Sequence, residues 1–224
     1  MSSREHVLSA IRANLPKLDR PLPEVPLFDR VDSGALLVAF RSSFERMGGI
    51  FLDPPVAGDA LGPVRDKIAA AGVICSVVPE LPGNREFAIA GSAAALADVD
   101  YAIVRASFAV AETGSVLLSE RDLRVNAVAY LAQHLIVLLD PDDIVANLHH
   151  AYRRPEFRTG HYASFHTGPS ATADIEGILI HGAQGVRSLS VLPLARQKPQ
   201  GAVNAQTASA SHPNPRLSEP DSRG

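Results

Sequence analysis

Cysteine is nearly absent from this sequence, and its scarcity excludes several kinds of site. The only cysteine in the 224 residues is Cys75, so the chain can form neither an internal disulfide nor a metal centre built from several thiolates. Cys75 lies in an apolar run, residues 73–78, that is typical of a buried strand, and we interpret it as an inert core thiol. Such low cysteine use fits a reducing, cytoplasmic compartment.

Long apolar runs and an excess of basic residues are missing as well. No run reaches the roughly 18 consecutive apolar residues of a membrane-spanning helix, and the N-terminus has no secretory pattern. The formal net charge is −3, which gives no reason to expect a nucleic acid as partner. The sequence therefore predicts a soluble, cytoplasmic protein without a membrane span.

Motifs for nucleotides and metals are also absent. The sequence contains neither the Gly-x-Gly-x-x-Gly pattern of dinucleotide-binding folds nor the Gly-Lys-Ser/Thr of phosphate-binding loops. Its eight histidines show no metal-ligand spacing; His149 and His150, for example, are adjacent and would point to different faces. We therefore expect no metal site and no cofactor in this chain.

What the sequence does contain is an alternation of helix and strand patterns. Hydrophobic residues make up 46% of the chain, enough for a sizeable core. The alternation predicts an α/β fold with a mostly parallel, mixed sheet and helices on both of its faces. We divide the chain into an N-terminal helix with a Pro-rich linker (1–30), a main domain (31–195) and a disordered tail (196–224).

The individual elements follow from periodicity and from capping residues. Helices are expected at 3–15, 34–47, 59–71 and 172–181, with a short one at 93–96 and another that begins at Asp140. Strands are expected at 50–52, 73–78, 87–90, 101–104, 108–111, 116–118, 134–139, 162–166 and 188–194. The strands at 108–111 and 116–118 are spaced as a hairpin.

The first candidate site is the stretch Thr-Gly-Pro-Ser-Ala-Thr-Ala-Asp-Ile-Glu at residues 167–176. It lies between a predicted strand and a predicted helix, where free backbone N–H groups would form an anion site. We expect it to bind a phosphate or carboxylate; helix capping alone is the alternative. The candidate ligand-binding residues here are Gly168, Pro169, Ser170, Thr172 and Asp174.

The second candidate site is the turn Glu112-Thr113-Gly114-Ser115, between two apolar runs. Glu112 could accept hydrogen bonds from a ligand, act as a general base or act as a covalent nucleophile; a water-facing turn residue is the alternative. His134 opens a predicted strand and could line the same sheet edge, or have a satisfied polar role. If the fold brings both turns to one edge, together they form a pocket.

Three arginines follow the strands near this second turn. Arg105, Arg121 and Arg124 could bind a carboxylate substrate through bidentate hydrogen bonds. A solvated surface position is the alternative interpretation for each of them.

Several of these segments together resemble the LUD-domain family. Residues 167–176 are similar to that family's "TGPS-x-TADIE" signature almost letter for letter, and residues 111–115 to its "ADTG(S/T)" segment. Residues 134–139 and 142–145 resemble its histidine-led strand and the helix start that follows. The order and spacing agree from about residue 85 to 194, and the N-terminal helix and linker are similar to the LutC/YkgG branch.

The resemblance implies a three-layer α/β/α sandwich like that of NagB, RpiA and CoA transferases. It also implies a LutC-type component that oxidises L-lactate to pyruvate together with LutA-like and LutB-like iron–sulfur proteins, which would carry the clusters that this chain lacks the cysteines to hold. A homo-oligomer is possible. Gln184 stands where the family has a histidine.

Two other functions remain open at this point. One is a stand-alone enzyme of the same fold that binds a carboxylate, phosphate or acyl-CoA, or transfers an acyl or phosphate group through Glu112; this rests on fold-level analogy. The other is a structural scaffold without a ligand.

Overall fold

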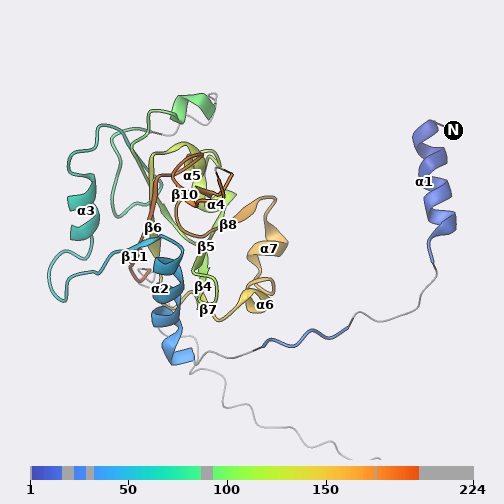
Figure 1. Cartoon of the computed structure of the whole chain (residues 1–224), viewed down its shortest axis with the longest axis horizontal. Helices are drawn as coiled ribbons and strands as arrows, with labels where there is room; N and C mark the ends of the chain where they lie inside the picture. The colour runs from blue at the N-terminus through green and yellow to red at the C-terminus, as the bar shows by residue number, and fades with distance from the viewer. Residues whose placement is uncertain (1, 17–22, 29–32, 87–92, 175, 197–224) are drawn as a thin grey trace, which may run out of the picture.

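The computed structural model describes residues 2–16, 23–28, 33–86, 93–174 and 176–196, in which helices and strands alternate (Figure 1). The α-helices are α1 (Ser3–Asn14), α2 (Leu36–Arg46), α3 (Gly62–Ile68), α4 (Glu120–Leu123), α5 (Val128–Leu131), α6 (Leu148–Ala151) and α7 (Glu156–Thr159), with 3₁₀ turns at Ser33–Ala35 and Ala93–Leu96. The strands are β1 (Ile50–Phe51), β2 (Ile74–Ser76), β3 (Tyr101–Arg105), β4 (Phe108–Val110), β5 (Ser115–Ser119), β6 (His134–Leu139), β7 (Ile144–Val145), β8 (Ala163–His166), β9 (Ala171–Thr172), β10 (Ile180–His181) and β11 (Ser188–Pro193). Within these ranges, no helix has the length and apolar character of a membrane span.

The centre of the fold is a five-stranded sheet in which every pair is parallel, in the order β1-β11-β6-β3-β2. Side chains alternate strictly along its strands. Leu135 and Val137 of β6 belong to the core on one face, whereas Ile136 and Leu138 belong to the core on the other. Both faces are therefore buried, which explains the continuous apolar runs of the sequence.

One face of this sheet is covered by helix α3. Leu61 and Val64 pack with Ile103 and Ile136 of the central strands, and Figure 1 shows α3 on that side of the sheet. Pro63 lies at the start of α3, where its missing N–H is not needed. The helix expected over 59–71 is thus confirmed, in a shorter form.

The other face is covered mainly by a second sheet, in the order β7-β4-β5-β8. Val116 and Leu118 of β5 belong to the core between the two sheets. Phe108 and Leu117 belong to a separate core on the opposite face of the second sheet. Ala151 of α6 and Phe157 of α7 cover that outer side. The expected hairpin is confirmed, but the single mixed sheet and the three-layer α/β/α arrangement are not. The antiparallel strands form a sheet of their own, because β5 pairs with β4 and β8 and not with any of the parallel strands. All five residues of β5 are buried.

The helix expected to begin at Asp140 is wrong. Asp140 closes a turn instead: its carboxylate accepts a hydrogen bond from the N–H of Asp142 at 3.1 Å. The β-branched pair Ile144–Val145 then forms β7 alongside β4, because its backbone completes the edge of the second sheet. The helix starts only at α6, where the Asn147 side chain accepts hydrogen bonds from the first-turn N–H groups.

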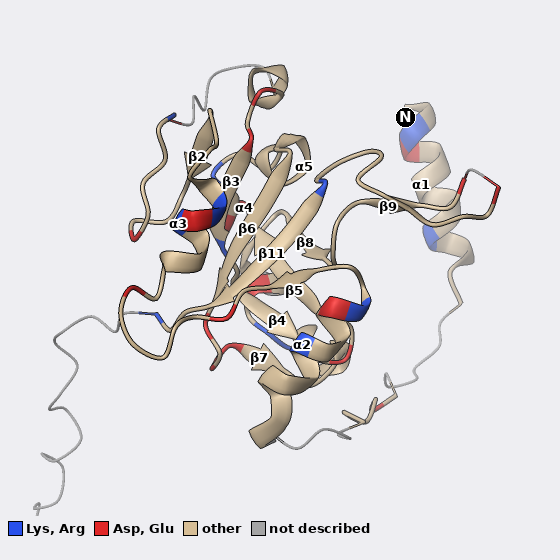
Figure 2. Cartoon of the chain, turned by 60° about the vertical axis from the view of Figure 1, so that its left-hand side comes forward, with Lys and Arg blue, Asp and Glu red and all other residues tan. Residues whose placement is uncertain are grey.

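The helix expected over 172–181 is also wrong. Strands β9 and β10 form an antiparallel hairpin there, and Figure 2 shows it extending from the body of the molecule. Glu176 and Gly177 have φ values of 54° and 71°, which a right-handed helix does not accommodate. Ile178 and Leu179, expected to face inward, are 62% and 60% exposed.

Helix α1 has the predicted start but no buried side. Ser2 and Glu5 form the expected capping box. None of the residues of α1 is buried, and the apolar side chains of Val7 and Ile11 are 53% and 54% exposed. Figure 1 shows α1 standing apart from the two sheets.

The remaining expected helices and strands divide into two groups. Helix α2, strands β1, β2, β3, β6, β8 and β11 and the short helix at 93–96 are confirmed. Cys75 is fully buried, and burial raises the pKa of its thiol. The strand expected at 87–90 and almost all of the tail expected at 196–224 lie outside the described residues.

Removal of residues 1–15 should leave the stability of the main body unchanged. Because α1 buries nothing, the truncated chain is expected to unfold within about 0.5 kcal/mol of the full chain in urea titrations. Phe44→Ala is the contrasting variant, since a fully buried phenylalanine is lost and about 3–5 kcal/mol with it. A truncated chain as unstable as Phe44→Ala would show that α1 packs on the body after all.

Candidate functional site

The two turns predicted to form one pocket do meet in the structure. The Ser115 hydroxyl lies 2.5 Å from the Thr167 hydroxyl and 2.7 Å from that of Thr113. A chain of three hydroxyls therefore links the β4–β5 turn to the start of the 167–176 stretch. The link lies beside the C-terminal end of α2.

The glycines of these turns allow close packing on α2. Gly114 has φ 69°, and a Cβ there would lie 2.3 Å from the backbone nitrogen of Phe44. Gly168 has φ 72°, and its Cβ would lie 2.2 Å from the carbonyl oxygen of Met47. Both positions exclude every other residue, because side chains rarely adopt this φ and because no space remains. Here the glycines serve backbone contact with the helix.

The rest of the 167–176 stretch holds the base of the β9–β10 hairpin. The Ser170 hydroxyl donates to the carbonyl of Gln184 at 2.8 Å, and the Thr172 hydroxyl donates to the Asp174 carboxylate at 2.8 Å. Pro169 packs against the loop that follows α2. Among the described residues of this stretch no helix begins, so they do not form the anion site expected at a helix N-terminus.

Glu112 and His134 lie apart from each other. Glu112 is exposed on its turn, where its carboxylate accepts a hydrogen bond from the N–H of Leu148 at 3.4 Å. His134 lies at the amino-terminal end of β6, bonded through Nδ1 to the Ser188 hydroxyl at 2.8 Å and stacked on Tyr101. Burial lowers the pKa of His134. His134 therefore has a polar partner on the neighbouring strand β11 through Nδ1.

A cluster of hydroxyls around His166 was missed at the sequence level. His166 Nε2 lies 2.8 Å from the Ser164 hydroxyl, to which Tyr130 and Tyr162 donate at 3.1 and 3.3 Å. The two tyrosine hydroxyls are also hydrogen-bonded to each other. Burial lowers the pKa of His166 to about 4 and raises that of Tyr130. The alternation Tyr162, Ser164, His166 along a strand was the signal that places all three on one face.

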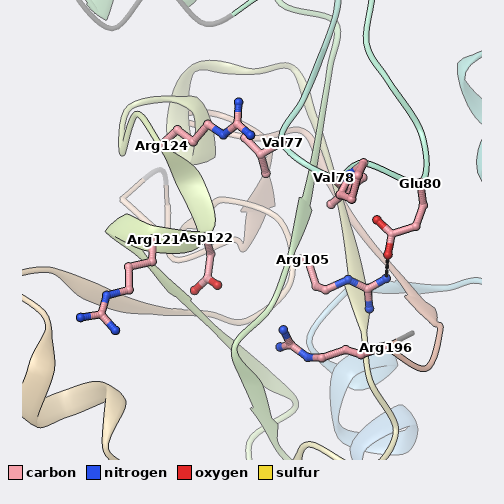
Figure 3. A pocket seen from close by; sticks show the side chains of 9 residues that line it. Val77, Val78, Glu80, Arg105, Arg121, Asp122, Arg124 and Arg196 are labelled. Atoms are coloured by element: carbon pink, nitrogen blue, oxygen red, sulfur yellow. Dashed lines mark hydrogen bonds and ion pairs between the residues drawn. The ribbon is translucent and has the colours of Figure 1, made fainter. Parts of the chain in front are cut away.

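A cavity lies elsewhere, beyond the carboxyl ends of the parallel strands (Figure 3). Its volume is about 690 Å³. Four arginines line it: Arg105, Arg121, Arg124 and Arg196. We call this space the arginine cavity. It contains the three arginines that the sequence singled out, together with Arg196 from beyond the last strand, but Glu112 is not among its lining residues.

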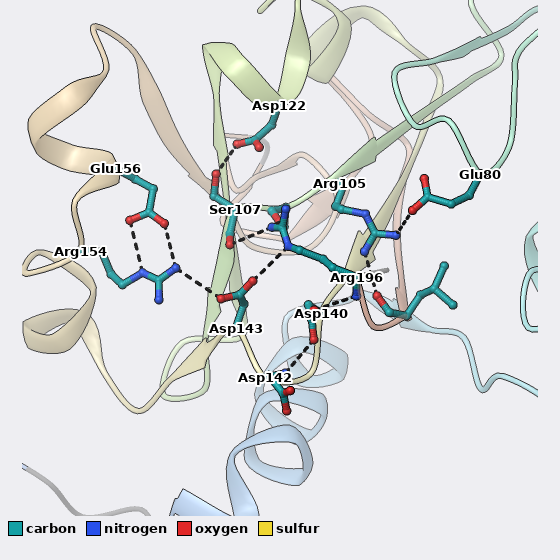
Figure 4. Close-up of polar contacts among 12 residues, drawn as sticks. Glu80, Arg105, Ser107, Asp122, Asp140, Asp142, Asp143, Arg154, Glu156 and Arg196 are labelled. Atoms are coloured by element: carbon teal, nitrogen blue, oxygen red, sulfur yellow. Dashed lines mark hydrogen bonds and ion pairs between the residues drawn. The ribbon is translucent and has the colours of Figure 1, made fainter. Parts of the chain in front are cut away.

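Two of the arginines are held firmly in its wall (Figure 4). Arg105 forms an ion pair of 2.6 Å with Glu80, and it donates to the carbonyl of Leu194. Arg196 pairs with Asp143 at 3.2 Å and donates to the carbonyl of Ala106. These contacts fix the positions of both guanidinium groups, which the sequence alone could not indicate because each partner lies far away along the chain.

Two carboxylates complete the polar lining. Asp122 accepts hydrogen bonds from the Ser107 and Ser119 hydroxyls at 2.6 and 2.7 Å, so it holds α4 against the strands. Glu80 uses one oxygen for Arg105, whereas its Oε2 is buried with no hydrogen-bond partner among the described residues. A buried oxygen left without a donor is costly, and a ligand or water in the cavity could supply one.

Asp140 also supports this edge of the sheet. Burial alone would raise its pKa, but hydrogen bonds from the backbone N–H groups of Arg196 and Asp142 lower it. The carboxylate therefore stays charged and fixes the segment that carries Arg196.

No metal centre is visible in the residues that the structure describes. No group of three or more histidine, cysteine, aspartate or glutamate side chains there could hold an ion. The chemistry that the arginine cavity offers is the binding of anions by guanidinium groups.

The glycine contacts can be tested with a matched pair. Gly114→Ala should destabilise the protein by several kcal/mol, because its Cβ meets the α2 backbone. Gly177 has a similar φ, 71°, but nothing lies within 4 Å of its Cβ, so Gly177→Ala should cost only about 1–2 kcal/mol. Urea unfolding measures both, and equal losses would show that the backbone conformation alone requires Gly114.

The pH dependence of stability should report on His166. The pKa of His166 is lowered to about 4 in the folded chain, whereas a histidine in the unfolded chain has a pKa near 6.5. The free energy of unfolding should therefore be highest above pH 6.5 and should decrease as the pH falls toward 4, because the unfolded chain then binds a proton that the folded chain does not. The loss should approach about 3 kcal/mol. His166→Asn should show a shallower decline over the same range in urea unfolding at pH 7.5, 6, 5 and 4. Parallel curves would contradict a buried, neutral His166.

Comparison with known proteins agrees with this architecture. Residues 83–192 match the family model described as the LUD domain. A crystal structure of a DUF162 family protein from Deinococcus radiodurans is similar with a TM-score of 0.55 at 17% identity, over 72% of this chain and 97% of that one, which shows a shared fold. The search of curated proteins gave no match. The matched segment, residues 83–192, carries both candidate turns and three of the cavity's arginines, so this part of the chain is similar to the LUD domain.

Proposed function

We propose that this chain is a LutC-type component of a lactate-utilisation system, which oxidises L-lactate to pyruvate with LutA-like and LutB-like iron–sulfur proteins. The LUD domain, which is associated with lactate utilisation, supports the pathway. The single, fully buried Cys75 supports the division of labour, because the clusters that pass electrons would then be held by the partners.

The observation that carries the proposal is the arginine cavity. Lactate and pyruvate are small carboxylates, and guanidinium groups bind carboxylates through paired hydrogen bonds. Ligands of open α/β sheets bind beyond the carboxyl ends of the strands, which is where this cavity lies. We assign the substrate carboxylate to the end of the cavity formed by Arg105 and Arg196, whose guanidinium groups are already fixed by Glu80 and Asp143.

The alternative of a transferase acting through Glu112 has no support from the geometry. Glu112 is exposed on the β4–β5 turn, whereas the arginine cavity is lined by residues that precede β4 and follow β5. A nucleophile on that turn would lack the anion-binding groups of the cavity.

Binding of L-lactate to the purified chain tests the cavity. Arg105→Lys keeps the charge beside Glu80 but loses the planar fork, so the affinity for L-lactate should fall by about tenfold in isothermal titration calorimetry. Arg46→Lys, on the exposed end of α2, is the matched control and should bind as the unmodified chain does. Equal binding by both variants would remove Arg105 from the site.

The proposed pathway is tested in the source organism. A clean deletion should abolish growth on L-lactate and leave growth on pyruvate intact, and the unmodified chain should restore growth. The tagged chain should also co-purify with iron–sulfur proteins. Normal growth of the deletion strain on L-lactate would refute the proposed function, whatever the cavity binds.

A further inference from the structure

Arg124 has an unusual backbone for a residue with a side chain. Its φ and ψ are 57° and −45°, and the N–H of Val125 donates to the carbonyl of Leu123 at 2.6 Å across it. This is a γ-turn with a positive central φ, the rare and strained form. Strained residues of this kind persist where the surrounding structure holds them, and they gather at binding sites.

The guanidinium group of Arg124 is also unusual among the cavity arginines. Arg105, Arg121 and Arg196 each donate to a carboxylate or a backbone carbonyl. In the described parts of the chain, no hydrogen bond or ion pair involves the side chain of Arg124. Figure 3 shows it beside Val77, whereas Arg105 lies next to Glu80. A cation left without a partner among the described residues is available to an anion.

The cavity is much larger than lactate. A three-carbon acid displaces the equivalent of a few waters, on the order of 150 Å³, against about 690 Å³ here. A second cavity of about 630 Å³ adjoins it and shares Val77, Val78, Pro79 and Arg124 as lining. Arg124 thus lies where the two spaces meet, and an apolar wall of three residues leads to it.

We infer that the arginine cavity binds an elongated organic dianion, with Arg124 as the anchor of its second acidic group. The first acidic group takes the place at Arg105 and Arg196, and an apolar spacer lies along Val77, Val78 and Pro79. The inference rests on the proposed function only in that both use the arginine cavity for anions. The ligand class differs, because the dianion would occupy the lactate position and also the part of the cavity that lactate is too small to reach.

A series of dicarboxylates tests this ligand class. The full chain is titrated calorimetrically with L-lactate, malonate, succinate, glutarate and adipate, and with pyrophosphate as a compact polyanion. Affinity should rise with spacer length, until the best dicarboxylate binds at least about tenfold more tightly than L-lactate. Pyrophosphate should gain no such advantage, because its charges lie too close together to reach both anchors.

Arg124→Gly is the decisive variant. Glycine adopts a positive φ without strain, so the variant should fold and its melting temperature should not fall. The affinity of the best dicarboxylate should drop to about that of L-lactate. Arg46→Ala, with the same change in charge, should keep the advantage of the dicarboxylate.

The possible failures can be told apart. If no anion binds, the arginine cavity is not the site and the proposed function loses its main support. If L-lactate binds and the dicarboxylates gain nothing, or if Arg124→Gly leaves their advantage intact, the elongated ligand alone is wrong. Pyrophosphate that binds as tightly as the best dicarboxylate would also overturn it.

Discussion

The constraint on which this structure depends is the burial of a parallel sheet on both faces. A parallel strand needs apolar cover above and below it, and β6 supplies alternating side chains to two separate cores. Helix α3 covers one face with a single short element. The other face needs a wider cover, which the second sheet and α2 provide together. The hairpin β4–β5 is therefore part of the core, and Gly114 in its turn packs against the backbone of α2 at Phe44.

This arrangement separates the two edges of the parallel sheet by role. At the amino-terminal edge lie His134, the hairpin base at Ser170 and the glycine contacts of both turns. His134 is hydrogen-bonded to Ser188, and Ser170 to the carbonyl of Gln184. At the carboxyl edge, the cavity is lined by Arg105 at the end of β3 and Arg196 beyond β11, together with Arg121 and Arg124 in and just after α4. The glycines of the two sequence motifs, Gly114 and Gly168, thus pack against α2. The four arginines of the cavity lie at the opposite edge.

The electrostatics of the arginine cavity follow from which cations are already paired. Glu80 and Asp143 fix Arg105 and Arg196, so these two present guanidinium groups in defined places, with part of their charge compensated. Arg124 has no such partner among the described residues, and its backbone forms a strained γ-turn. The two ends of the cavity therefore differ in charge: Arg105 and Arg196 are each paired with a carboxylate, whereas Arg124 is not.

The sequence by itself determined the parallel strands and helices α1 to α3, because apolar periodicity and capping residues act over a few neighbouring residues. It left open whether the two turns meet, which the fold decided. It failed at 140–146 and 172–181, where local helix signals were overruled by strand pairing with distant segments. It named Arg105, Arg121 and Arg124 but placed them near Glu112. Only the tertiary structure decided that they join Arg196 and Glu80 in one cavity, since ion pairs between residues far apart along the chain leave no pattern in the sequence.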